Sequence, residues 1–261
     1  MNNSFTFLQN QFDVVGNTKL KIYPDGTFNI TCCNKDIFTT QGYEIASYEN
    51  NECNKNTPKN YDTSNPSRKD SIRRAKAKVH DISLLNQFDY FVTLTLSTEK
   101  IGDRYDKQLV KEKLNTWLKN MVTRHNLIYL LLPEYHKDGA IHMHMLCSGD
   151  LDLYNTGYYD KNRKEIIGLK NWKFGFSSVY QIYGDRSHVS KYITKYVTKD
   201  SQKIFGKFYY SGGKGIKRDV PFKVLDIDFN ALVDLKKYDI TGTNTSFCYP
   251  TIDDLLERGL I

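Results

Sequence analysis

Two histidines stand two residues apart in the apolar stretch Ile141-His142-Met143-His144-Met145. Side chains alternate between the two faces of a β-strand, so His142 and His144 are expected to project together while the three apolar residues are buried. Two imidazoles at this spacing can hold one divalent ion. A pair of surface histidines on a strand would give the same spacing, so the motif by itself leaves both interpretations open.

Glu134 is the candidate third ligand, and its position depends on the hairpin turn at Lys137-Asp138-Gly139. If these three residues form the loop with Gly139 left-handed, Glu134 lies directly across from His142, with Cβ atoms about 5 Å apart. His136 would then lie on the same face. A two-residue Asp-Gly loop would instead place Glu134 on the opposite face. Two imidazoles and a carboxylate suit Mn²⁺, Zn²⁺, Ni²⁺ or Co²⁺, and also Mg²⁺ when phosphate supplies further oxygens.

A second group with reactive side chains is the stretch Tyr192-Ile193-Thr194-Lys195-Tyr196-Val197-Thr198-Lys199. Residues four apart share one face of a helix, so Tyr192 is expected beside Tyr196, and Lys195 beside Lys199. An adjacent apolar stripe would seat the helix on a sheet: Val189, Ile193 and Val197. A phenol has a pKa of about 10, and a metal or a nearby lysine would help it to attack phosphate. A surface helix with packed tyrosine rings is the alternative.

The elements that must position these groups alternate between strand and helix patterns. Apolar spacing predicts helices over residues 67–87, 106–124 and 186–199, and strands over 90–96, 127–136, 140–147 and 173–182. Residues 150–170 are predicted to be irregular. This order predicts an α+β fold with a central antiparallel sheet and flanking helices, packed on one face of the sheet.

The chain is predicted to have three parts. Residues 1–66 form an N-terminal extension of short strands and a flexible linker, residues 67–213 form the core, and residues 214–261 form a C-terminal extension. Asn, Asp, Lys, Ser and Pro dominate residues 49–67, which offer almost nothing to bury. The C-terminal extension is expected to contain short strands and a small helix near residues 252–258.

Composition narrows the setting more than the chemistry. The formal charge is +7 and the pI about 8.9, a balance that is compatible with a nucleic-acid partner. Five cysteines without a C-x-x-C spacing give little support to a zinc site or a disulfide framework. The longest apolar stretch, Leu127 to Leu132, is far too short for a membrane span. We therefore predict a reduced, cytoplasmic location in a bacterial host cell.

Three stretches resemble, in order, the three motifs of the HUH replication initiators of rolling-circle plasmids and single-stranded-DNA phages. They are Phe91 to Leu96, Pro133 to His144, and Tyr192 to Lys199. The doubled tyrosine is similar to that of the A proteins of small isometric phages. Ser71 to Ala75 and Lys207 to Ser211 also resemble phage replication proteins, so the resemblance covers roughly residues 67–213.

The resemblance implies an HUH endonuclease core, of the HUH/RRM-like nickase type, that starts rolling-circle replication. Glu134, His142 and His144 would hold a divalent metal ion, Mg²⁺ or Mn²⁺, against a phosphate of the single-stranded DNA origin. Tyr192 or Tyr196 would attack that phosphate and form a 5′-phosphotyrosine link, assisted by Lys195 and Lys199. A host polymerase would extend the free 3′ end. No G-x-x-x-x-G-K-[S/T] loop occurs, so a host helicase is expected to unwind the duplex.

Basic and aromatic residues on both sides of the motifs are candidate DNA contacts. They are Arg73, Arg74, Lys76, Lys207, Tyr209, Lys217 and Arg218. Solvated charged surfaces would show the same composition. Two other functions remain open: a single-strand transposase or relaxase-like HUH enzyme, and a non-catalytic nucleic-acid-binding module. Relaxases usually carry their tyrosines near the N-terminus, whereas here they follow the histidine motif.

Overall fold

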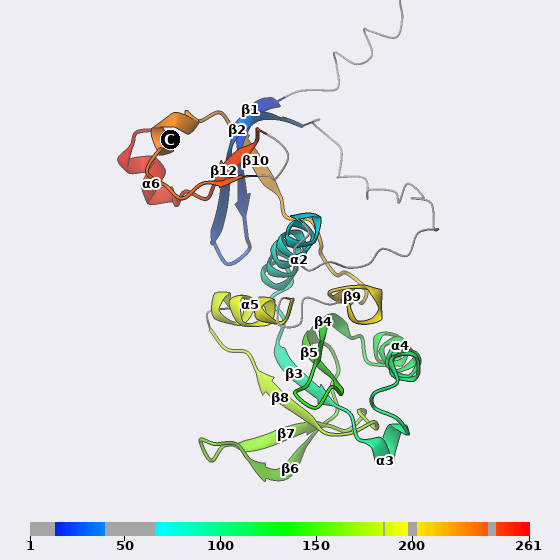
Figure 1. Cartoon of the computed structure of the whole chain (residues 1–261). Helices are drawn as coiled ribbons and strands as arrows, with labels where there is room; N and C mark the ends of the chain where they lie inside the picture. The colour runs from blue at the N-terminus through cyan, green and yellow to red at the C-terminus, as the bar shows by residue number, and fades with distance from the viewer. Residues whose placement is uncertain (1–13, 40–65, 185, 198–202, 240–243) are drawn as a thin grey trace, which may run out of the picture. The chain divides into compact units, whose positions relative to one another are not determined.

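The computed structural model describes residues 14–39, 66–184, 186–197, 203–239 and 244–261 (Figure 1). The chain divides into two compact units, one of Ser67–Arg218 and one that combines Met1–Pro66 with Asp219–Ile261. Most of the flexible linker predicted at 49–67 lies outside the described residues. The sequence separates the N-terminal and C-terminal extensions, yet their described strands share one sheet.

The larger unit contains a seven-stranded antiparallel sheet with the strand order β6-β7-β8-β3-β5-β4-β9. Its elements are α2 (Pro66–Leu85), β3 (Tyr90–Thr95), α3 (Thr98–Ile101), α4 (Lys107–Arg124), β4 (Ile128–Tyr135), β5 (Ile141–Ser148), β6 (Leu153–Tyr159), β7 (Glu165–Leu169), β8 (Ser177–Gln181), α5 (Ser187–Thr194), the 3-10 turns η1 (Lys195–Val197) and η2 (Ile204–Gly206), and β9 (Tyr210–Gly212). The sheet and helices confirm the predicted α+β class.

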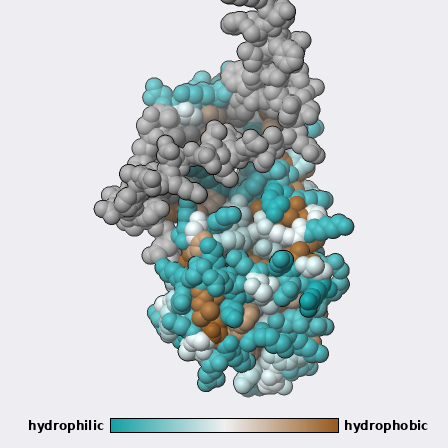
Figure 2. Space-filling view, turned by 90° about the vertical axis from the view of Figure 1, so that its right-hand side faces the viewer, coloured by the Kyte–Doolittle hydropathy of each residue, from teal (hydrophilic) through white to brown (hydrophobic). Residues whose placement is uncertain are grey.

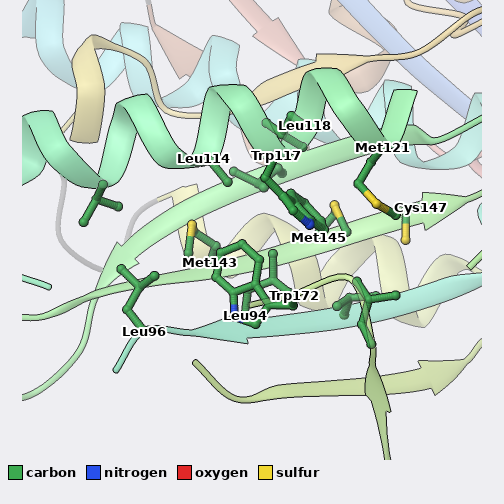
Figure 3. Packing of buried hydrophobic residues seen from close by; sticks show 14 of the residues in the cluster. Leu94, Leu96, Leu114, Trp117, Leu118, Met121, Met143, Met145, Cys147 and Trp172 are labelled. Carbon is green, nitrogen blue, oxygen red and sulfur yellow. The ribbon is translucent and has the colours of Figure 1, made fainter. Parts of the chain in front are cut away.

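Helix α4 covers one face of this sheet. The Asp106 side chain caps the helix by accepting hydrogen bonds from the backbone N–H groups of Gln108 and Leu109. The residues that the helix buries recur at intervals of three and four positions: Val110, Leu114, Trp117, Leu118 and Met121. They pack against alternate residues of β3 and β5, among them Leu94, Met143, Met145 and Cys147 (Figure 3). This alternation leaves His142 and His144 on the opposite face.

Helices α2 and α5 lie on that opposite face. Ala75, Val79 and Ile82 of α2 and Ile193 of α5 form one buried cluster with Leu146 of β5 and neighbouring residues of β4 (Figure 1). The prediction that helices cover only one face is therefore wrong. The apolar stripe of each helix shows that one side is buried, but it contains no information on which face of the sheet receives it.

Two predicted elements also differ from the structure. Residues 150–170 contain the paired strands β6 and β7, where an irregular segment was expected. The helix predicted at 186–199 changes to the tighter turn η1 after Thr194, and residues 198 and 199 lie outside the described part of the chain. The strand expected at 173–182 is shorter and begins at Ser177. Strand β6 is mostly exposed, so its sequence lacks the alternation that identifies a half-buried strand.

The smaller unit is built on a five-stranded antiparallel sheet with the order β10-β1-β2-β12-β11. Its elements are β1 (Val14–Ile22), β2 (Phe28–Thr39), β10 (Phe222–Leu225), the 3-10 turn η3 (Phe229–Leu232), β11 (Tyr238–Asp239), β12 (Ser246–Cys248) and α6 (Ile252–Glu257). The turn predicted at Pro24-Asp25-Gly26 joins β1 to β2. Helix α6 begins at a capping box between Thr251 and Asp254.

The visible surface is mostly hydrophilic, and hydrophobic residues are confined to patches (Figure 2). Among the helices that the structure describes, none combines the length and apolar character needed to cross a bilayer. The four cysteines in the described ranges, Cys32, Cys33, Cys147 and Cys248, are free thiols.

Candidate metal and tyrosine site

The hairpin between β4 and β5 has the register that brings Glu134 opposite His142. The His136 N–H donates to the Ala140 carbonyl at 2.7 Å, so residues 137–139 form the loop. Gly139 has a φ of 86°, in the left-handed region that favours glycine. The three-residue loop is thus the observed alternative, and Glu134 and both motif histidines share one face of the sheet. We call this the site face.

Glu134, His142 and His144 each offer one ligand atom, and these atoms lie within 4.8 Å of one another. Glu134 and His144 are buried, and His144 Nε2 lies 2.9 Å from Glu134 Oε1. His136 is near, with its ring 5.6 Å from that of His142, but its Nδ1 lies 3.1 Å from Asp138 Oδ1. Two imidazoles and one carboxylate at this separation suit a divalent cation, so the residues present fit the expected metal.

Two threonines of β3 orient the histidines. Thr93 pairs with His144 across the strands, and Thr95 pairs with His142. The Thr93 hydroxyl lies 3.3 Å from His144 Nδ1, and the Thr95 hydroxyl lies 2.6 Å from His142 Nε2. Neither threonine was assigned a role from the sequence. The period-two spacing of Thr93 and Thr95 in a strand, matching that of the histidines, is the signal that could have identified them.

The two tyrosines meet directly above this group. The ring of Tyr196 stacks on that of His144 with centroids 3.7 Å apart and an interplanar angle of 17°. The Tyr196 hydroxyl donates to the Tyr192 hydroxyl at 2.7 Å. Phe91 of β3 supports the Tyr192 ring edge-on at 5.4 Å. Both hydroxyls are therefore held beside the candidate metal ligands.

The environments of the tyrosines differ, although their sequence positions look equivalent. Tyr192 is 45 % exposed, whereas Tyr196 is half-buried against His144. Burial of Tyr196 raises its pKa, and the interactions with Tyr192 and with the Glu134 carboxylate raise it further. Ile193 and Val197 are buried in the cluster under α5, as the apolar stripe predicts. This anchoring fixes the direction in which both rings point.

The lysines are placed only in part. Lys195 lies beside Tyr192, with its Nζ 5.4 Å from the centre of the Tyr192 ring. Lys199, the second predicted assisting residue, lies outside the described residues. The structure therefore brings together five of the seven residues to which the sequence assigns metal or nucleophile roles, with Lys195 adjacent to them.

The predicted DNA contacts fall into two groups. Arg73, Arg74 and Lys76 lie on α2, where Arg73 pairs with Asp70 at 3.3 Å. The second group, Lys207, Tyr209, Lys217 and Arg218, lies around the edge strand β9.

The β9 group is held by several contacts. The Arg218 Nε donates to the Ser211 hydroxyl at 3.2 Å. The Lys217 N–H donates to Asn86 Oδ1 at 2.8 Å, which joins this segment to the end of α2. Lys207 extends over the Tyr210 ring, and Tyr209 packs partly into the cluster beneath α2. These seven residues thus do not form one patch with the metal-ligand group.

Comparisons with known proteins point to replication. Residues 89–201 match the model of a family described as replication-associated protein ORF2. No curated protein and no solved structure matches the chain significantly. The matched range runs from the residue before β3 to the segment after the tyrosines, so it includes Glu134, His142, His144 and both tyrosines. The part of the chain that carries the candidate site is therefore a domain of the replication-associated protein ORF2 family.

Proposed function

We propose that this protein initiates rolling-circle replication by nicking single-stranded DNA in a metal-dependent reaction that uses tyrosine as the nucleophile. The observation that carries the proposal is the stacking of Tyr196 on His144, with the Tyr192 hydroxyl 2.7 Å from that of Tyr196. Two phenols are thereby held against a set of residues suited to a divalent cation. The family match supports a role in replication.

In the proposed step, the hydroxyl oxygen of one tyrosine attacks a backbone phosphorus atom. A new bond forms between the tyrosine oxygen and phosphorus, and the bond from phosphorus to the 3′-oxygen breaks. The phenol gives up its proton and the leaving 3′-oxygen gains one, so the products are a 5′-phosphotyrosine and a free 3′-hydroxyl. The covalent link keeps the phosphodiester energy for rejoining the strand. With two tyrosines, the second can cleave the regenerated origin and release a circle.

Each residue of the site has a distinct proposed task. Glu134, His142 and His144 hold Mg²⁺ or Mn²⁺, which polarises the scissile phosphate and offsets its developing charge. Thr93 and Thr95 keep the imidazoles oriented. Lys195 lies beside Tyr192 and favours negative charge near that phenol. Lys199 is proposed for the same task at Tyr196 from its position in the motif.

The proposed partners follow from this chemistry. The substrate is an unpaired origin strand, because the scissile phosphate must reach tyrosines seated on a sheet face. A host polymerase extends the 3′-hydroxyl, and a host helicase separates the strands. A cytoplasmic location in a bacterial host is part of the same proposal.

The test uses a pool of random-sequence single-stranded oligonucleotides, because it does not require the origin to be known. The wild type, Tyr192→Phe, Tyr196→Phe and the double variant are incubated with end-labelled pool in Mn²⁺, Mg²⁺ or EDTA. Covalent adducts are separated on denaturing gels and the attached DNA is sequenced. Tyr183→Phe, which changes an exposed tyrosine outside the site, is the matched control.

We expect a metal-dependent adduct that carries the 3′ fragment, with a shared sequence next to the linkage. The two hydroxyls are adjacent, so each single variant should still form an adduct through its remaining tyrosine, and the double variant should form none. Cutting without an adduct would indicate a metal-dependent hydrolase. Binding of the pool without cutting by the wild type would indicate a non-catalytic binding module.

A further inference from the structure

Four exposed aromatic side chains lie on or next to β6 and β8, beyond the residues assigned above. Tyr154 is 41 % exposed, Tyr158 65 %, Phe176 39 % and Tyr180 39 %. Large exposed rings of this number in one part of a surface commonly mark a binding surface. We call these four residues the aromatic platform, and their positions relative to the site face decide what they can bind.

One row of residues across the sheet connects the site to the platform. His142 on β5 pairs with Thr95 on β3. The Thr95 N–H donates to the Phe176 carbonyl at 2.8 Å, so Phe176 is the next residue across the sheet from Thr95. The Phe176 ring contacts that of Tyr158 at 6.0 Å. Residues opposite each other in antiparallel strands share a face, so Phe176 and Tyr158 continue the site face outward.

A second row runs parallel to the first and has small side chains. His144 pairs with Thr93, and Thr93 pairs with Ser178 on β8. On β7 the pairing of Ile167 with Val179 places Gly168 next along this row. Tyr154 pairs with Gly168 and its ring covers that glycine, since a Cβ there would lie 2.5 Å from the ring. The floor of the site face is thus low between the histidines and Tyr154.

Tyr180 closes the other side of this low floor. It pairs with Phe91, the residue that supports the Tyr192 ring. The floor of Thr93, Ser178 and Gly168 is therefore bordered by rings and begins at the tyrosines. Four strand spacings separate β5 from β6, which gives a path of about 19 Å.

From this arrangement we propose that the aromatic platform binds the bases of the unpaired DNA strand that flanks the scissile phosphate. The inference rests on the proposed function and specifies where its substrate lies. Charge favours a nucleic acid, because residues 67–218 contain 28 lysines and arginines against 15 aspartates and glutamates. Lys161, Arg163 and Lys164 are exposed in the turn between β6 and β7. Base stacking on exposed rings with nearby cations is the usual chemistry of single-strand binding.

The test measures binding by fluorescence anisotropy in EDTA, where no cleavage takes place. The probes are a labelled oligothymidylate of about fifteen nucleotides, within the usual site size of single-strand-binding surfaces, and an oligonucleotide of the same length in which abasic sites replace most bases. The wild type is compared with a double variant, Tyr158→Ala with Tyr180→Ala. Tyr158→Phe with Tyr180→Phe keeps both rings, and Tyr183→Ala removes an exposed ring outside the platform. Thermal unfolding shows that each variant is folded.

We expect the wild type to bind the oligothymidylate more tightly than the abasic probe. The double alanine variant should lose about fivefold or more of its affinity for oligothymidylate, while its affinity for the abasic probe is unchanged. The double phenylalanine variant and Tyr183→Ala should bind like the wild type. Equal binding of both probes by the wild type, or unchanged binding by the alanine variant, would overturn the platform. Tighter binding of oligouridylate would assign it to RNA instead.

Adduct formation separates this inference from the proposed function. If the wild type forms adducts while the double alanine variant binds DNA normally, the platform is refuted and the nicking activity stands. If binding depends on bases and on the platform but the wild type forms no adduct, the DNA surface stands and the nicking chemistry is refuted.

Discussion

At the scale of single residues, the direction of the two histidines depends on hydroxyl groups of the neighbouring strand. The Thr93 hydroxyl lies at Nδ1 of His144, which leaves Nε2 to face Glu134 at 2.9 Å. A metal-binding histidine commonly has its second ring nitrogen fixed in this manner, and loss of the outer partner typically reduces metal affinity by about 10- to 100-fold. Thr93 is therefore a positioning residue in our proposal.

Thr93→Val should weaken Mn²⁺ binding by about 10- to 100-fold, because it removes the hydroxyl while keeping a β-branched side chain of similar shape. Isothermal titration calorimetry with Mn²⁺ measures the change directly. Ser178→Ala is the matched control, since Ser178 pairs with Thr93 on the other side and has no contact with the ligand group among its described hydrogen bonds. Equal Mn²⁺ affinity of Thr93→Val and wild type would contradict the positioning role.

At the scale of elements, the hairpin from β4 to β5 assembles the ligand group because its loop has three residues. A shift of one residue in register would turn Glu134 to the opposite face. Gly139 makes this loop possible with its φ of 86°. An added Cβ at Gly139 would meet nothing within 4 Å, so the cost of a substitution comes from the backbone conformation alone.

Gly139→Ala should lower the free energy of unfolding of the larger unit by about 1–2 kcal/mol, and Gly139→Asn by less, because asparagine adopts left-handed conformations more readily. Urea unfolding followed by tryptophan fluorescence is suited to this test. Both tryptophans of the chain, Trp117 and Trp172, are buried in the larger unit and report its unfolding. A Gly139→Asn variant that is less stable than Gly139→Ala would show that something other than backbone conformation is responsible.

The hairpin also shows how far local sequence rules reach. Loop length and the period of two were enough to predict that Glu134 faces His142, because both are local properties of the backbone. Strands β6 and β7 were missed, since edge strands that bury little need no apolar alternation. The inequivalence of Tyr192 and Tyr196 depends on which ring meets His144 from another element. The aromatic platform, in turn, depends on strand order, which spacing does not encode.

At the scale of the whole molecule, charge and hydrophobic cores are divided between the two units. The clusters under α4 and under α2 and α5 consist entirely of residues from 67–218, and the cluster around Ile30 and Leu255 belongs to the other unit. Outside residues 67–218 the chain has nine lysines and arginines against 15 aspartates and glutamates. The net positive charge of the protein therefore comes from the unit that contains the candidate site.

We expect the fragment of residues 67–218 to fold cooperatively, to bind Mn²⁺ and to form the tyrosine adduct, because it contains both hydrophobic clusters and the whole described site. It should bind oligothymidylate at low salt more tightly than the full chain, since the acidic remainder is gone, and log affinity should fall linearly with log salt concentration. Anisotropy titrations at several salt concentrations, with calorimetric melting, measure both properties.

A shorter fragment of residues 67–213 provides the matched comparison. It lacks Lys217 and Arg218, whose bonds to Asn86 and Ser211 tie the end of the unit to α2 and β9, so it should melt at a lower temperature than residues 67–218. Equal melting temperatures would place the end of the core at residue 213. If residues 67–218 fold and bind Mn²⁺ but form no adduct where the full chain does, the smaller unit must contribute to the reaction, and the core is not sufficient for nicking.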